Sequence, residues 1–242
     1  KETTSPDTVG SGGGGIFMEG TARLRLTGVT IQNCTSKAPG GGLRMDYDDT
    51  GGGTLTMKNC KIINNMVKDD GGIAESSGGG IGLPNCPYTA VIDTCEISRN
   101  KVDVSTKKGS GPLTITACGL YTGNMQTSIT EIKGHTVIDG NSYVKHDART
   151  TKVSGIGIWM QGGVVNIGEN GKPDSKSPVI RNHQVGDANK VYGTAIYLEG
   201  SAVVNWRSGH ITGNGGPAAK AVYVRTGYGN PVFNNTSGHT EN

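Results

Sequence analysis

The sequence has few aromatic residues, no long apolar run and no marked excess of charge, and each shortage excludes a class of protein. Aromatic residues make up 5% of the chain and hydrophobic residues 33%, so the composition does not predict one thick core. No apolar run of about 18 residues is present, so we expect no transmembrane helix and no membrane insertion. Lys and Arg are scattered and the net charge is +3, so we expect no nucleic-acid partner.

Glycine, by contrast, is abundant, with 41 residues, and it recurs just before a short hydrophobic strand signal. The first copy of this motif is Gly15-Ile16-Phe17-Met18, a small residue followed by aliphatic, variable and aliphatic positions. Further copies begin at Gly42, Gly80, Gly119, Gly157, Ala195 and Ala221. A second strand signal with two-residue alternation follows most copies. Repeats this small cannot bury their own apolar faces, so we expect them to stack on their neighbours.

A third strand signal, Ile-x-x-Asn, ends at a recurrent asparagine. It is complete at Asn65, Asn100, Asn141 and Asn214. The segment 232–235 is a close variant, and Cys34 and His183 stand at the asparagine position of two imperfect copies. Asparagine tolerates the left-handed backbone of a sharp corner, and its amide can bond the coils above and below. The pattern therefore predicts an internal asparagine ladder.

Three short strands per repeat predict an all-β fold, a single-stranded right-handed parallel β-helix of about seven coils. This domain would span 12–236, between a polar lead at 1–11 and a tail at 237–242. The pattern resembles the pectate-lyase-like superfamily, and the paired GG(G)I and I-x-x-N signals are similar to bacterial adhesin-like and polymorphic outer-membrane protein repeats. The resemblance implies an extracellular or cell-surface protein. Neither end shows a cap, so we expect part of a larger polypeptide.

Polar insertions follow the asparagine corner in several repeats. They lie at 66–77, 102–110, 143–154 and 184–192, and another insertion at 168–177 leaves a different corner. On a solenoid, insertions at equivalent corners gather on one side and often form the binding face. The alternative is that they are only solvated loops.

The variable position of the first strand is rich in aromatic residues. Its neighbours should point inward, so this position should face outward. Consecutive copies place Tyr121, Trp159, Tyr197 and Tyr223 there. Coils about 4.8 Å apart would stack these rings into a continuous stripe, which would suit a sugar or a partner domain. The alternative is a ring ladder that only stabilises the coils.

Clustered aspartates are the other candidate site. They are Asp46, Asp48, Asp49, Asp69 and Asp70. The glycosidases and lyases that share the β-helix fold use clustered carboxylates on one face, and a glycosidase needs two carboxylates roughly 5 to 9 Å apart. The same oxygens would suit calcium. We find no acidic column through adjacent repeats, so catalysis is the less favoured hypothesis.

Cysteine and histidine spacing does not indicate a metal site. The five cysteines lack a zinc spacing, and none of the five histidines has metal-ligand spacing. Cys60 and Cys95 occupy equivalent places in consecutive repeats, which predicts stacked buried thiols, with a disulfide as the alternative. Apart from the calcium alternative, we expect no cofactor and no metal.

These observations favour an extracellular binding or adhesion module of a bacterial surface or secreted protein. A glycan or a host surface protein would be its partner, and the four aromatic residues would be its ligand-binding site. The alternative is a carbohydrate-active enzyme, either a glycoside hydrolase or a polysaccharide lyase, that uses the aspartates. A passive structural spacer is the third hypothesis, favoured if the rings prove to be covered.

Overall fold

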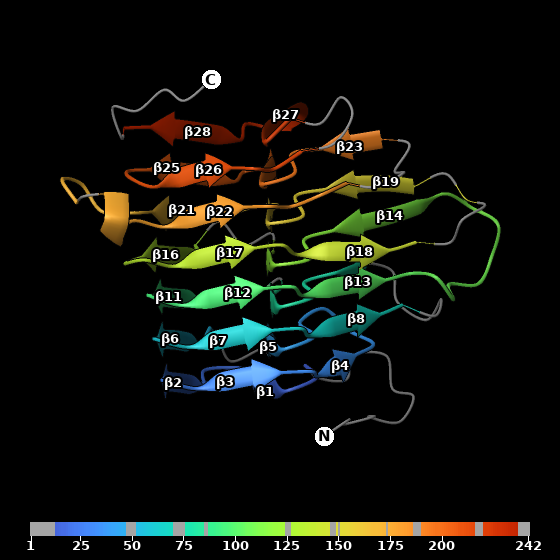
Figure 1. Ribbon diagram of the computed structural model, residues 1–242, viewed down its shortest axis with the longest axis horizontal. Helices are drawn as coiled ribbons and strands as arrows, with labels where there is room; N and C mark the ends of the chain where they lie inside the picture. Colours follow the sequence, from blue (N-terminus) through green and yellow to red (C-terminus); the bar gives the residue numbers. More distant parts are fainter. Residues whose placement is uncertain are drawn as a thin grey trace.

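The chain winds into a stack of coils that rises from the N-terminus to the C-terminus (Figure 1). The computed structural model describes residues 13–46, 52–69, 76–84, 87–123, 127–145, 149, 151–172, 174–185, 190–215 and 220–236. Within these ranges the strands form five sheets, and the strands pair in parallel. No helix among the described residues has the length and apolar character needed to cross a membrane.

Three sheets form the main body of the solenoid. The first contains β1 (Ile16–Glu19), β5 (Leu43–Asp46), β10 (Ile81–Leu83), β15 (Leu120–Thr122), β20 (Ile158–Met160), β24 (Ile196–Gly200) and β27 (Val222–Gly229). The second contains β2 (Arg23–Thr27), β6 (Thr54–Lys58), β11 (Thr89–Asp93), β16 (Ile129–Lys133), β21 (Val164–Ile167), β25 (Val203–Trp206) and β28 (Val232–Asn235). The third contains β3 (Thr30–Gln32), β7 (Lys61–Ile63), β12 (Glu96–Ser98), β17 (Val137–Asp139), β22 (Val179–Arg181) and β26 (His210–Thr212).

The register of these sheets confirms the repeat alignment. In the first sheet Leu43 pairs with Ile16 on one side and with Ile81 on the other, and the aliphatic position stays aligned through all seven strands. In the third sheet Ile62 pairs with Ile31 and Ile97. Most of these aliphatic side chains are buried and belong to one continuous core. A seven-coil right-handed β-helix is therefore the fold that the motif spacing predicts.

The asparagine ladder is also confirmed, including its imperfect members. Each backbone N–H at the ladder position donates to the side chain at the same position one coil further on. The donor and acceptor pairs run from Cys34 to Asn65 (3.0 Å), Asn65 to Asn100 (3.0 Å), Asn100 to Asn141 (2.9 Å), Asn141 to His183 Nδ1 (3.1 Å) and His183 to Asn214 (3.0 Å). The ladder therefore fixes the axial spacing of the coils at one internal corner.

The residue before each first strand is small, glycine in five coils and alanine in two, and in the glycine coils the ladder lies against it. A Cβ atom on Gly42 would come within 2.8 Å of Asn65 Nδ2, and one on Gly80 within 2.8 Å of Asn100 Nδ2. Both distances are well below ordinary van der Waals contact. The two sequence motifs, glycine before the first strand and asparagine after the third, are thus two sides of one packing contact.

The last copy of the asparagine pattern was assigned to the wrong sheet. Segment 232–235 is β28, and its Phe233 pairs with Val204 of β25 in the second sheet. The chain turns at Gly229, immediately before this segment, so the strand that follows β27 reaches only the second sheet. Asn234 stays outside the core, where its Nδ2 donates to Asn205 Oδ1 at 2.9 Å.

The corner insertions, together with the segments 35–36 and 113–116 outside their predicted bounds, contribute the strands of two additional sheets. The fourth sheet contains β4 (Thr35–Ser36), β8 (Met66–Lys68), β13 (Lys101–Asp103) and β18 (Ser142–Val144). The fifth contains β9 (Ser76–Ser77), β14 (Leu113–Thr116), β19 (Thr151–Ser154) and β23 (Lys190–Tyr192). Both lie on one side of the solenoid, at the right of Figure 1. The insertions therefore gather on one side, as expected.

These insertions are not merely solvated loops, because they enclose a second apolar core. Val67, Val102, Ile115 and Val153 are its centre, each with at most 1% of its surface exposed. Val102 and Val153 each lie between two polar neighbours, so these short alternating strands were not recognised within polar segments. The insertion at 168–177 is separate and contains the 3-10 helix η1 (Asp174–Lys176), at the left of Figure 1.

Stacked free thiols are confirmed at Cys60 and Cys95. The backbone N–H of Cys60 donates to Cys95 Sγ at 3.4 Å, and both thiols are free and buried. Burial raises the pKa of the Cys95 thiol to about 11, so it stays protonated and unreactive at neutral pH. Cys86 lies outside the described residues.

Candidate functional site

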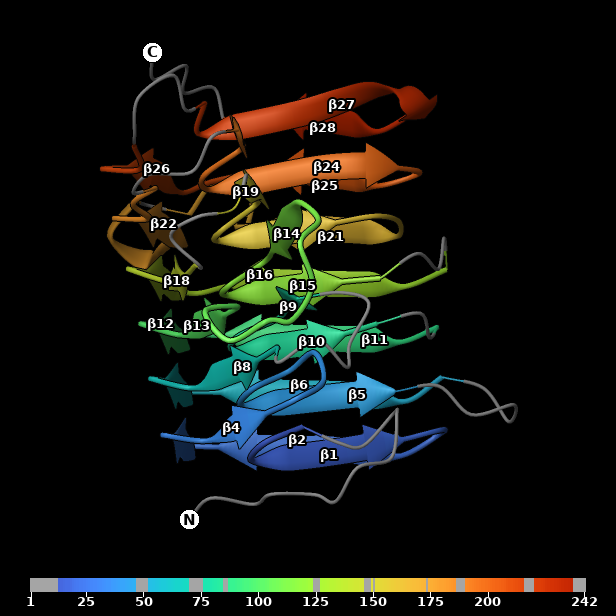
Figure 2. The same cartoon turned by 90° about the vertical axis from the view of Figure 1, so that its right-hand side faces the viewer.

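One side-chain column runs along the outer face of the first sheet, which faces the viewer in Figure 2. Its members, in coil order, are Phe17, Arg44, Gly82, Tyr121, Trp159, Tyr197 and Tyr223. The ring centroids are 5.0 Å apart between Tyr121 and Trp159, 6.4 Å between Trp159 and Tyr197, and 5.6 Å between Tyr197 and Tyr223. The predicted stripe of four adjacent rings is therefore present, with the Tyr121 and Trp159 rings tilted by 38° and the other two pairs stacked.

Three of these rings are covered, which corrects the expectation of an open platform. Tyr121, Trp159 and Tyr197 expose only 1%, 5% and 2% of their surface. The chain that leads into each first strand folds back over the ring column. Gly155, at φ +56°, is so close that a Cβ atom would lie 2.9 Å from Trp159 Cα. Tyr121, Trp159 and Tyr197 therefore form a third small core, and a ligand has no direct access to them.

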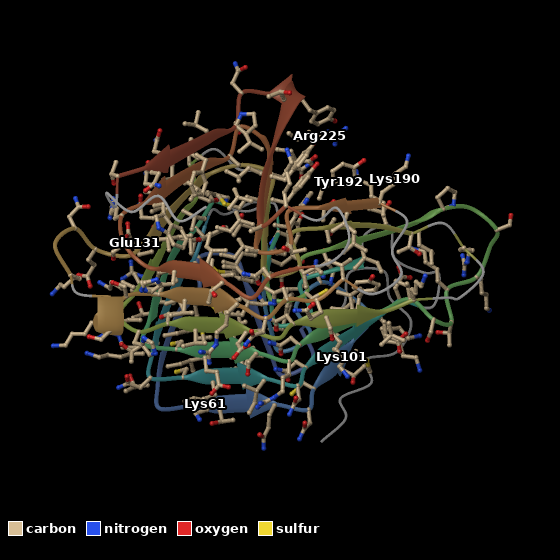
Figure 3. The ribbon with its side chains drawn as sticks, turned by 45° about the horizontal axis from the view of Figure 1, so that its top comes forward. Lys61, Lys101, Glu131, Lys190, Tyr192 and Arg225 are labelled. Carbon is tan, nitrogen blue, oxygen red and sulfur yellow. The ribbon has the colours of Figure 1, made fainter. Side chains whose placement is uncertain are left out.

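The run of four rings opens at its C-terminal end, where Tyr223 is half-buried. Its ring stacks on Tyr197 on one side and meets the edge of Tyr192, from β23, at 5.0 Å and 68° on the other. Tyr228 follows on the same strand and is 58% exposed, with the Arg225 guanidinium 5.1 Å from its ring centroid. Figure 3 shows Arg225, Tyr192 and Lys190 next to one another at this end. We call Tyr192, Tyr223, Arg225 and Tyr228 the tyrosine cluster.

A buried hydrogen-bond network supports the tyrosine cluster from below. The Tyr197 hydroxyl donates to Glu199 Oε2 at 3.0 Å, and Arg225 Nη1 donates to the same oxygen at 2.7 Å. Burial and the Glu199 charge raise the pKa of the Tyr197 hydroxyl, so Tyr197 remains a donor at neutral pH. The hydrogen bond to Glu199 raises the pKa of Arg225. Glu199 therefore holds a permanent cation beside the exposed rings.

Lysine side chains border the tyrosine cluster on the fifth sheet. Lys152 of β19 lies directly beside Lys190 of β23 in the parallel register. The Lys152 ammonium is 5.4 Å from the centroid of the Tyr192 ring, a cation–π distance. The surface at this end of the molecule is therefore both aromatic and basic.

The predicted aspartates do not assemble into one site in the described part of the chain. Asp46 ends β5 and ion-pairs with Arg44 of the same strand. Asp69 follows β8 in the fourth sheet, fully buried, and ion-pairs with Lys107. Asp69 is therefore structural. Asp48, Asp49 and Asp70 lie outside the described residues.

One carboxylate neighbour of Asp46 was missed. Glu19 of β1 pairs with Asp46 in the parallel register, so two acidic side chains project side by side from adjacent coils. The sequence signal was present, because both residues stand three positions after the aligned aliphatic residue. Among the described residues, no three His, Cys, Asp or Glu side chains come together in a way that could hold a metal ion.

Parallel coils around an internal asparagine ladder define a β-helix solenoid. The chain belongs to the right-handed β-helix family, whose sequence model, described as a right-handed β-helix region, matches residues 7–237. No curated protein and no solved structure matches the chain significantly. The match establishes the fold, and the function has to be argued from the surface.

The sequence did not indicate most of the tyrosine cluster. Of its four residues only Tyr223 stands at the repeated variable position of the first strand. Tyr192 lies in an insertion assigned as a loop. Arg225 stands one position after the repeated strand motif, where Glu199 stands in the preceding coil, and Tyr228 lies where β27 extends beyond the earlier first-sheet strands. Aligning the insertions with one another would have revealed that Tyr192 belongs to a strand beside Lys152.

Proposed function

We propose that this chain is a carbohydrate-binding β-helix module of an extracellular or cell-surface protein, part of a larger bacterial polypeptide with an adhesive role. Its ligand would meet the tyrosine cluster. The observation that carries the proposal is the arrangement of Tyr192 and Tyr223, two half-buried rings in edge-to-face contact beside the cation of Arg225.

The chemistry of the cluster suits a sugar. The apolar face of a pyranose ring packs on aromatic rings, and its hydroxyls need donors and acceptors close to those rings. The tyrosine cluster offers ring faces and edges, phenolic hydroxyls and a guanidinium within one small area. The buried Glu199 contact holds Arg225 in place before a ligand arrives, which lowers the entropic cost of binding.

Glycan-array binding by single-residue variants tests the proposal. Replacing Tyr192 or Tyr223 with Ala should weaken binding at least about tenfold, because each change removes a ring from the contact. Phe17→Ala is the matched control, since Phe17 is an exposed ring (41%) at the far end of the same column. Undiminished binding in both tyrosine variants would exclude the cluster, and no binding by the wild type would favour the passive spacer.

The neighbouring carboxylates Glu19 and Asp46 favour an enzyme as the second candidate. Adjacent parallel strands lie about 4.8 Å apart, which is near the carboxyl separation of a retaining glycosidase. Arg44 already forms an ion pair with Asp46. Glu19 is exposed and has no described hydrogen bond to Arg44. Hydrolysis or elimination of a polysaccharide that is lost in both Asp46→Asn and Glu19→Gln would establish this activity and replace the binding proposal.

A further inference from the structure

Within the described part of the chain, no ion pair accounts for the lysine pair (Lys152 and Lys190) beside the tyrosine cluster. Lys152 and Lys190 face each other on adjacent strands of the fifth sheet, on the side away from the second core. Like charges directly opposite each other in a sheet destabilise it slightly. No described carboxylate lies within ion-pairing distance of either ammonium group. By contrast, Lys61 and Arg181, on the third sheet, each pair with a carboxylate of an adjacent coil.

The lysine pair and the tyrosine cluster form one continuous surface. The Lys152 ammonium lies over the Tyr192 ring, and Tyr192 in turn meets Tyr223. Lys190 is exposed, and both Lys152 and Tyr192 are half-buried. A sugar ring on the tyrosines would therefore lie beside two cations. The third cation of the surface, Arg225, is already paired with Glu199.

We infer that this surface takes a glycan carrying anionic substituents, either carboxylate or sulfate, which would lie between Lys152 and Lys190. The inference rests on the proposed function, because the sugar ring itself would be held by the tyrosine cluster. One anionic group with two or three acceptor oxygens can accept a hydrogen bond from each ammonium at once. It would also remove the repulsion between the lysines.

A polyanion such as nucleic acid fits this surface less well than an anionic glycan does. The net charge of the whole chain is only +3, and the residue beside Lys152 on the preceding strand of the fifth sheet is the uncharged Thr114. Nucleic-acid binding depends on many phosphate contacts along an extended basic stripe. Two cations beside tyrosine rings suit a ligand with one charged group next to a sugar ring.

The test uses probes that share one backbone and differ in charge. Binding to dextran, carboxymethyl dextran and dextran sulfate is titrated at low and physiological salt, beside an array that contains neutral, carboxylated and sulfated oligosaccharides. The variant Lys152→Gln/Lys190→Gln removes the pair. Lys172→Gln/Lys176→Gln is the matched control, because it removes the same charge from exposed positions at the opposite side of the solenoid (Figure 1).

The expected result has three parts. Anionic glycans bind more tightly than neutral ones, the Lys152→Gln/Lys190→Gln variant weakens anionic binding at least about tenfold, and the control variant binds as the wild type does. Weak binding to neutral glycans is unchanged in the control variant, and in the lysine-pair variant it falls less than anionic binding does, because Lys152 also contacts the Tyr192 ring. The carboxylated and sulfated arms identify which anionic group is preferred.

Four results would overturn the inference. If neutral glycans bind as tightly as anionic ones, the charge preference is wrong and the carbohydrate-binding function stands. If no glycan binds, both proposals fail. If the control variant loses as much affinity as the lysine-pair variant, or duplex DNA competes equally well, the attraction is a general effect of positive charge.

Discussion

Asn100 and Asn141 share one oxygen atom between two hydrogen bonds. The backbone N–H of Asn100 donates to Asn141 Oδ1 at 2.9 Å, and Asn100 Nδ2 donates to the same oxygen at 3.1 Å. Asn100 Nδ2 also donates to the carbonyl of Ile62, one coil back, at 2.8 Å. A single side chain thus ties three consecutive coils together inside the solenoid.

We predict that Asn100→Ala lowers the free energy of unfolding by about 3 kcal/mol, because buried partners on both adjacent coils lose their hydrogen bonds. Urea denaturation followed by circular dichroism measures the change. The matched control is Asn234→Ala, which removes an exposed amide on the second sheet and should change stability by less than about 1 kcal/mol. Equal effects in the two variants would mean that a ladder amide stabilises the fold no more than an exposed amide does.

The coil register could be predicted from the sequence where the same packing contact requires the same residue types in every coil. The small residue before the first strand and the asparagine after the third strand contact each other, as Gly80 and Asn100 do. Such a contact repeats at each coil, so its residues repeat too. The register could therefore be predicted to the residue, and even His183 was recognised as a substituted ladder position.

Solvent exposure could not be predicted from the sequence where equivalent positions in different coils are buried to different extents. Tyr197 and Tyr223 occupy equivalent positions, yet Tyr197 is buried and Tyr223 is half-buried, because Tyr223 stacks on Tyr197 whereas β27 is the last strand of the first sheet. Likewise, the alternation in β23 spans only three residues, Lys190 to Tyr192, which is too short to separate a strand from a polar loop.

The close contact at Gly80 leads to a second prediction. Gly80→Ala would place a Cβ atom 2.7 Å from the Gly119 carbonyl oxygen and 2.8 Å from Asn100 Nδ2, so it should lower the free energy of unfolding by about 2 kcal/mol or more. Gly111→Ala is the control, since nothing lies within 4 Å of the added methyl group. It should be neutral or stabilising by up to about 1 kcal/mol. A tolerated Gly80→Ala would show that the ladder can shift to make room.

A third prediction separates the buried rings from the proposed ligand surface. Trp159→Ala should destabilise the protein by about 3 kcal/mol or more, because it empties the centre of the third core. Trp159→Phe keeps a ring there and should cost less, and its folded form should bind glycans as the wild type does. Thermal unfolding and array binding measure the two effects. Loss of binding by a folded Trp159→Phe variant would place the ligand on the buried rings instead.

His183 makes the ladder sensitive to acid. Its Nδ1 accepts a hydrogen bond from the Asn141 N–H, so the proton of the neutral ring is on Nε2, where no acceptor among the described residues lies within hydrogen-bond distance. Burial lowers the pKa of His183 to about 4, compared with about 6.5 for histidine in an unfolded chain. Between these two values the unfolded state binds the proton more readily. The contribution of His183 to stability is therefore constant above pH 6.5 and falls as the pH drops towards 4.

The fourth prediction follows from that difference in pKa. Acidification from pH 7.5 to pH 4 should cost the wild type about 3 kcal/mol more than it costs His183→Asn, since each pKa unit corresponds to about 1.4 kcal/mol. Asparagine is the residue found elsewhere in the ladder, so the His183→Asn variant should fold. It should lack only the pH-dependent contribution of His183 to the free energy of unfolding. Urea denaturation at both pH values measures it, with His135→Asn, an exposed position, as the control. If His183→Asn and His135→Asn lose the same stability on acidification, protonation of His183 does not open the solenoid, and the acid-sensitive groups lie elsewhere.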